Sequence, residues 1–115
     1  MIHIPNPVVH WEVTGKDGKK LQGFYGALFD WHVDANNPVG YGMVDTHAGG
    51  INGGVSASDA QRVTFFVEVG DLQAYLNKAE RLGGKTVMPP TEIPNTVTFA
   101  FFSDPEGNVI GLVKG

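Results

Sequence analysis

The 115-residue sequence contains no cysteine and few basic residues, and both shortages exclude classes of protein. Without cysteine there is no disulfide framework, no thiol nucleophile and no cysteine-based zinc site. The chain has 8 Lys and Arg against 12 Asp and Glu, a formal net charge of -4, and only Lys19 and Lys20 are adjacent. Because nucleic-acid surfaces need a basic patch, we expect no nucleic-acid partner.

Long apolar stretches are also missing. No run approaches the roughly 20 residues that a membrane-spanning helix needs, so we expect no membrane partner. The opening residues, Met-Ile-His-Ile-Pro-Asn-Pro, lack the charged-then-apolar layout of a signal peptide, so we expect a cytoplasmic location. Hydrophobic residues make up 42% of the chain. A chain of this length and composition can bury a core as one domain without disulfides or metals.

The first half of the chain begins with a strand pattern and continues with a helix pattern. From Val9 to Thr14 apolar and polar residues alternate, and this period of two predicts a half-buried strand. Asp17 is placed to cap a following helix. Short strands are predicted at Tyr41–Thr46 and Ile51–Ser56. Four apolar residues at helical spacing are predicted to face a sheet. They are Leu21, Phe24, Leu28 and Trp31.

After a polar connector at residues 56–61, the same order of elements restarts. A helix is predicted from Leu72, with Gly83 as its C-terminal stop. Pro89 and Pro90 are predicted to end the strand before them. The predicted strands of this half are Arg62–Val69, Lys85–Met88, Thr96–Phe102 and Val109–Val113. The turn before the last strand, residues 104–107, has proline and glycine where a tight turn needs them.

Each half therefore has the order βαβββ, with His10 and Thr64 in equivalent places on the two first strands. We predict an α+β fold of eight strands and two main helices in a single domain, residues 1–115. Its two modules cover about residues 7–56 and 62–114, and neither could bury its sheet alone. Apolar strand residues should lie under the helices. They are Trp11, Val13, Phe65, Val67 and Val69, and in the second module they should pack on Leu72, Tyr75 and Leu76.

Four segments, spread over essentially the whole chain, carry a resemblance to a known family. They are Val8-Val9-His10, Phe24 to Phe29, Val69-Gly70-Asp71-Leu72, and Phe102 to Asn108. In this order and at these separations the chain resembles the vicinal oxygen chelate superfamily. That superfamily includes glyoxalase I, extradiol dioxygenases and the bleomycin- and fosfomycin-resistance proteins. The resemblance implies that the two modules pair and that their strands curl into an open barrel; it does not fix an activity.

The resemblance also implies four positions for metal ligands, typically His, Glu, His and Glu. In this sequence they fall on His10, on Asn52 (or Gly53 if the register slips), on Thr64 and on Gly111. Only His10 is a good ligand, and a catalytic metal needs about three protein ligands. We therefore expect these positions to be vestigial, with no metal and no cofactor bound.

Gly111 stands in the middle of the last predicted strand, where glycine is unfavourable. Since the family pattern carries a ligand there, we expect its glycine to leave space in a cavity. The residues expected to line that cavity are His10, Glu12, Tyr41, Asn52, Thr64, Phe66, Glu68 and Gly111. Alternatively, Glu12 and Glu68 are solvated at strand ends, and His10 is a hydrogen-bonded residue without function.

Two classes of function fit this cavity. The first is metal-independent binding of a small, partly apolar organic molecule, as in bleomycin-resistance proteins; carboxylates and aromatic faces would favour a planar or cationic guest. The second is a glyoxalase- or dioxygenase-like enzyme (a lyase, isomerase or oxygenase) that uses His10, with Glu12 as acid–base partner or with a metal. A purely structural or protein-interaction role is a third possibility. We expect a homodimer, since the family often pairs modules across a two-fold axis.

Overall fold

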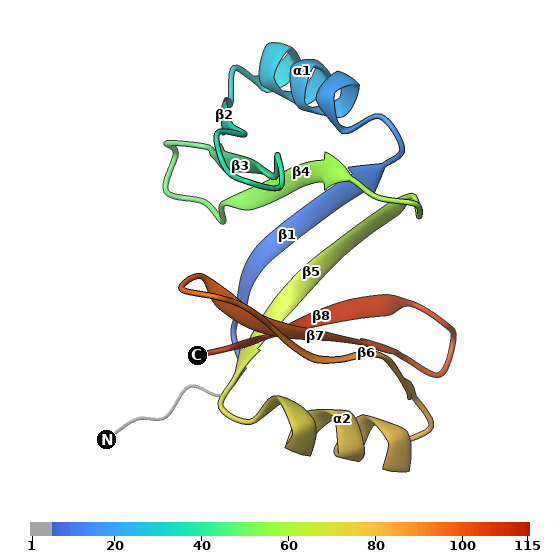
Figure 1. Cartoon of the computed structure of the whole chain (residues 1–115). Coiled ribbons are helices and arrows are strands. Elements are labelled where there is room, and N and C mark those ends of the chain that lie inside the picture. Colours follow the sequence, from blue (N-terminus) through green and yellow to red (C-terminus); the bar gives the residue numbers. More distant parts are fainter. Residues whose placement is uncertain (1–5) are drawn as a thin grey trace. The chain divides into compact units, whose positions relative to one another are not determined.

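Figure 1 shows the computed structural model of the chain, which describes residues 6–115. The first module consists of β1 (Val8–Gly15), α1 (Gly18–Phe29), β2 (His32–Asp34), β3 (Gly42–Asp45) and β4 (Gly53–Ala57). The second consists of β5 (Arg62–Val69), α2 (Leu72–Arg81), β6 (Lys85–Ile93), β7 (Val97–Ser103) and β8 (Val109–Lys114). The predicted α+β fold of two βαβββ modules is therefore confirmed. Within the described residues, neither helix has the length and apolar character needed to cross a membrane.

The chain forms two compact units whose boundaries cut through the first strand of each module. One unit is His10–Thr64. The other joins residues 6–9 with Phe65–Gly115. Each unit therefore contains one helix, three whole strands and the larger part of the first strand of its module.

In the 10–64 unit the strand order is β2-β3-β4-β1. β1 and β4 are parallel, and the other neighbours are antiparallel. Helix α1 contacts β2 and β4 (Figure 1). Asp17 caps α1 as predicted, because its side chain accepts a hydrogen bond from the Lys20 N–H at 3.0 Å. The three-residue strand β2 is the strand of this module that the sequence pattern did not locate.

The predicted inward face of α1 is wrong for two of its four residues, whereas Leu21 and Trp31 are half-buried and the Trp31 ring lies 5.3 Å from that of Trp11 on β1. Phe24 and Leu28 are 57% and 56% exposed. A polar side chain also points toward the sheet: Gln22 donates from Nε2 to the Val55 carbonyl at 2.9 Å and to the Gly40 carbonyl at 3.1 Å. Because these two bonds fix the rotation of the helix, its apolar residues do not all turn inward.

In the unit that contains residues 65–115 the strand order is β5-β8-β7-β6, with β5 and β8 parallel. Helix α2 contacts β6, β7 and β8 (Figure 1). Asp71 caps α2 by accepting from the Ala74 N–H at 3.1 Å, and Gly83 ends it with a φ of 100°. The buried core cluster of this unit joins both layers. Its members are Val69, Leu72, Leu76, Ala100 and Leu112.

Strand β6 corrects the prediction that a strand ends before Pro89. It continues through Pro89 and Pro90 to Ile93, with register shifts against β7 between Thr86 and Thr91. The strand is at the end of the sheet order and pairs with β7. Proline lacks a backbone N–H, and an edge strand with bulges is where a sheet tolerates that loss.

Candidate functional site

The predicted site residues divide between the two units. His10, Glu12, Tyr41, Asn52 and Thr64 belong to the 10–64 unit. Phe66, Glu68 and Gly111 belong to the unit that contains residues 65–115. Each unit therefore holds its own group of candidate side chains.

Strand β1 places His10 and Glu12 on one face, since side chains two residues apart point the same way. The Tyr41 hydroxyl contacts both of them: its oxygen is 2.8 Å from His10 Nε2, and it donates to Glu12 Oε2 at 3.0 Å. All three residues are half-buried. The Tyr41 oxygen can at the same time accept from His10 Nε2 in the tautomer that carries the ring hydrogen on that nitrogen. These three residues form the His10–Tyr41–Glu12 cluster.

Two features of the 10–64 unit position Tyr41, which lies just before β3. The Asn37 side chain holds its backbone, donating from Nδ2 to the Tyr41 carbonyl at 2.6 Å and accepting from the Tyr41 N–H at 2.9 Å. Gly54 makes room for the ring, because a Cβ at this position would overlap the Tyr41 hydroxyl. Gly54 pairs with Glu12 in the β1–β4 register, which places the phenol beside the carboxylate.

Burial sets the protonation of the cluster. It lowers the pKa of His10, which favours the neutral imidazole. It raises the pKa of Glu12, while the hydrogen bond from Tyr41 and the positive charge of Arg62 act in the opposite direction. Burial and the neighbouring Glu12 carboxylate raise the pKa of Tyr41 far above its usual value, so its hydroxyl stays protonated. The cluster can therefore donate, accept or pass a proton along a hydrogen-bonded chain.

Asn52, the predicted second metal position, lies in the turn before β4 and is exposed. Its side-chain oxygen accepts from the Thr46 N–H at 3.1 Å, so the residue stabilises that turn. The alternative position, Gly53, has no room for a larger side chain because a Cβ there would overlap the Trp11 ring. Thr64 is buried, with 5% of its surface exposed. Across residues 6–115, no group of three or more His, Asp and Glu side chains is placed to hold a metal ion.

Gly111 does not leave an empty space, and this prediction is wrong. Gly111 pairs with Phe66 in the parallel β5–β8 register. A Cβ at Gly111 would overlap the Phe66 ring, which is itself packed against Phe101 with ring centroids 5.4 Å apart. The glycine is needed because an aromatic ring lies flat across it. Glu68, further along β5, is half-buried, and its backbone N–H donates to the Pro7 carbonyl at 2.9 Å.

Sequence reasoning missed Asn37 and Gly54, the two residues that position Tyr41. The signal for Gly54 was present as a second glycine in the strand pattern next to Gly53. The role of Asn37 depends on a contact with backbone four residues away, inside an irregular turn. Local sequence patterns therefore offered no means to assign it.

Comparisons with known proteins agree with the resemblance seen in the sequence. The model of the glyoxalase-like domain family matches residues 12–113. The chain is 29% identical over 107 residues to "Putative glyoxylase CFP32" of Mycobacterium bovis and of Mycobacterium tuberculosis. Each match covers 84% of this chain and 41% of the relative, so the chain spans less than half the length of these curated relatives.

Solved structures show the same fold at low sequence identity. A methylmalonyl-CoA epimerase from Mycobacterium tuberculosis is 14% identical, with a TM-score of 0.67 over 99% of this chain and 92% of that one. A glyoxalase/bleomycin resistance protein/dioxygenase superfamily member from Vibrio splendidus 12B01 is 15% identical, with a TM-score of 0.65 over 96% and 99% of the two chains. At identities this low, the similarity shows a shared fold but not a shared activity, which depends on the residues of the site.

Proposed function

Because the chain belongs to the glyoxalase-like domain family, we propose that it binds a small, partly apolar organic molecule at the His10–Tyr41–Glu12 cluster, without a metal ion. The observation that carries this proposal is the hydrogen bonding of one phenol to both an imidazole and a carboxylate in a half-buried setting. A few fixed polar groups among apolar walls are typical of small-molecule sites.

The bonding within the cluster supports the metal-independent form of the proposal. His10 Nε2 faces the Tyr41 oxygen, and Glu12 Oε2 accepts the Tyr41 hydrogen. A metal ion bound at His10 Nε2 and Glu12 Oε2 would have to replace these bonds, and Gly54, opposite Glu12 on β4, supplies no ligand atom from a side chain. Protein that retained one nickel, zinc or manganese ion per chain after dialysis would contradict this part of the proposal.

The ligand we propose is planar and cationic. The Glu12 carboxyl group lies beside Tyr41, whose aromatic ring is stacked on His10 with centroids 6.2 Å apart. A carboxylate beside aromatic faces attracts a positive guest. A thermal-shift screen should therefore favour cationic aromatic compounds over neutral compounds of the same shape.

Matched variants make this screen specific. Glu12→Gln removes the charge and Tyr41→Phe removes the hydroxyl, and both should weaken the cationic hits. Glu92→Gln, an exposed change in β6, should leave them unaffected. Hits that bind all three variants as tightly as the natural protein would exclude the cluster as the binding site.

A second candidate function is acid–base catalysis, and the hydrogen bond from Tyr41 to Glu12 favours it. The Glu12 carboxylate could accept a proton from a C–H bond of a bound substrate, and the resulting carboxylic acid could return a proton to the substrate carbanion. One structural neighbour is an epimerase by name. An isomerase of this kind would exchange a substrate proton for deuterium in D₂O, whereas a binding protein would return its ligand unlabelled.

We further propose that the protein is cytoplasmic and forms a homodimer. The exposed apolar side chains of α1 support the dimer. Phe24, Leu28 and Phe29 are each more than half exposed, and a contiguous apolar surface favours association. Light scattering should give twice the chain mass. A monomer mass at tens of micromolar protein would contradict this assembly.

A further inference from the structure

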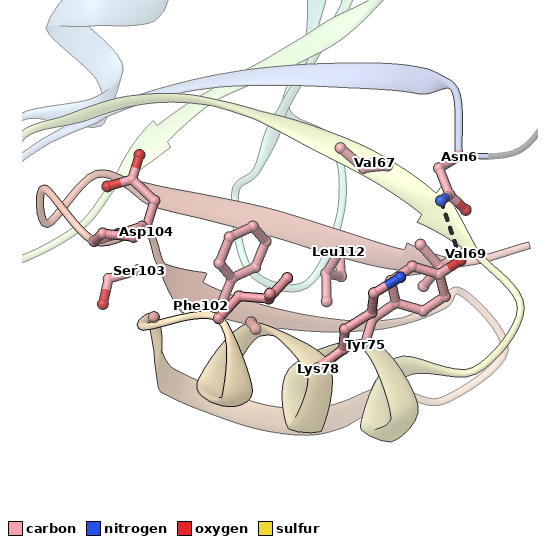
Figure 2. A pocket seen from close by; sticks show the side chains of 13 residues that line it. Asn6, Val67, Val69, Tyr75, Lys78, Phe102, Ser103, Asp104 and Leu112 are labelled. Atoms are coloured by element: carbon pink, nitrogen blue, oxygen red, sulfur yellow. Dashed lines mark hydrogen bonds between the residues drawn. The ribbon is translucent and has the colours of Figure 1, made fainter.

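A cavity of about 340 Å³ lies between α2 and the sheet in the unit that contains residues 65–115 (Figure 2). Its sheet side is formed by apolar residues of β5, β7 and β8, and its helix side by α2. The volume falls within the range of small-molecule sites. No residue of the His10–Tyr41–Glu12 cluster lines it.

The cavity exists because α2 presents two different stripes to the sheet. Leu72 and Leu76 are buried in the core cluster. The neighbouring stripe consists of Tyr75, Ala79 and Leu82, which line the cavity. Since Ala79 contributes only a methyl group at the centre of this stripe, the space above the sheet is not filled. Opposite it lie Val67, Val69, Phe102 and Leu112.

One end of the cavity carries hydrogen-bond donors and a positive charge. Asn6 donates from Nδ2 to the Tyr75 hydroxyl oxygen at 3.0 Å, which leaves the phenol hydrogen able to reach another acceptor (Figure 2). Lys78 follows Tyr75 by three residues and so shares its side of the helix. Among the described residues, no acidic side chain lies within ion-pair distance of the Lys78 ammonium.

The opposite end carries a negative charge that is held in place. Asp104 lies at the far side of the cavity from Asn6 in Figure 2. Its Oδ1 accepts from the backbone N–H groups of Glu106 and Asn108, each at 2.9 Å, and its Oδ2 accepts from Asn108 Nδ2 at 2.8 Å. These bonds lower the pKa of Asp104 and keep it ionised. An anionic ligand group would therefore be repelled from this end and attracted to the other.

We propose that this cavity binds an apolar monocarboxylate. The hydrocarbon part lies between Ala79 and the sheet, and the carboxylate accepts from the Tyr75 hydroxyl and the Lys78 ammonium. The apolar walls exclude water from the hydrocarbon part, while the charge at the rim fixes its direction. This site shares no residue with the His10–Tyr41–Glu12 cluster, and it would bind an anion where the cluster would bind a cation.

The test uses sodium octanoate as probe, with 1-octanol and octylamine as neutral and cationic compounds of the same chain length. Isothermal titration calorimetry on the full chain should give octanoate a dissociation constant on the order of 1 mM or tighter, as expected for so small a ligand. Amide signals of Val69 and Leu112 should shift on titration. Lys78→Gln should weaken octanoate binding by about fivefold, the upper range for one exposed charge contact, and leave 1-octanol binding unchanged.

Three further variants decide the outcome. Arg81→Gln removes the same charge from the same last turn of α2 outside the cavity lining, and should bind octanoate like the natural protein. Ala79→Leu should fill the cavity and abolish binding, with circular dichroism to show that it is folded. His10→Gln should keep full octanoate binding, which separates this site from the proposed cationic one. Equal affinity for octanoate and 1-octanol would overturn the proposal. Octanoate binding by Lys78→Gln as tight as that of the natural protein would also overturn it. So would the absence of binding at an octanoate concentration about ten times the expected dissociation constant.

Discussion

Replacing Gly111 by alanine should destabilise the protein, because the added methyl group would overlap the Phe66 ring. The ring is confined: it is 7% exposed and packs against Phe101 on β7. It cannot move without disturbing that contact. Overpacking of this kind typically costs about 1–3 kcal/mol, and we expect a value in that range rather than the small effect of an exposed glycine replacement.

A double-mutant cycle in urea denaturation tests this reasoning. Phe66→Ala alone should cost about 3–5 kcal/mol, because it leaves a cavity. In the Phe66→Ala background, Gly111→Ala should cost less than in the natural protein by about 1 kcal/mol or more, since the ring that it would strike is gone. Gly70→Ala is the control, because no atom lies within 4 Å of a Cβ built there. Additive effects of the two changes would refute the proposed overlap.

Three further predictions concern the cluster and the last turn. Gly54→Ala should displace the Tyr41 phenol, lowering stability by about 1–3 kcal/mol and weakening ligand binding in the thermal-shift screen. Burial raises the folded pKa of Glu12, so its contribution to stability is present below its unfolded pKa and is lost as pH rises through the folded pKa. In urea denaturation, the free energy of unfolding of Glu12→Gln relative to that of the natural protein should therefore be higher at pH 7 than at pH 4. Hydrogen bonds lower the folded pKa of Asp104, so Asp104→Ala should destabilise at neutral pH, with a difference that shrinks as pH falls through that pKa.

Local chemistry in the sequence determined the order of elements and their ends. Asp17 and Asp71 cap helices with their own side chains, and Gly83 takes the positive φ that stops α2. These features depend on contacts between residues three or four positions apart, so the sequence alone displays them. Apolar periodicity located seven of the eight strands, and missed β2, which at three residues is too short to show a period.

Within the elements, some residues could be assigned to the candidate site from the sequence and others could not. The period of two in the sequence is enough to put His10 and Glu12 on one face of a strand. The Tyr41 hydroxyl bonds to both side chains only because a loop about thirty residues further along the chain brings it there. The Asn37 side chain fixes the backbone of Tyr41 in that loop. No local pattern encodes a contact of that separation.

Only the tertiary structure decided what the glycines are for. In the sequence, Gly111 and Gly54 are equally consistent with an open cavity and with a close contact. Strand pairing sets Gly111 beside Phe66, while the chain after α1 brings the Tyr41 ring over Gly54. A missing side chain is visible in the sequence, but the group that fills its place comes from a distant strand or loop. Strand register and side-chain packing determine which group this is, and neither can be read from the glycine itself.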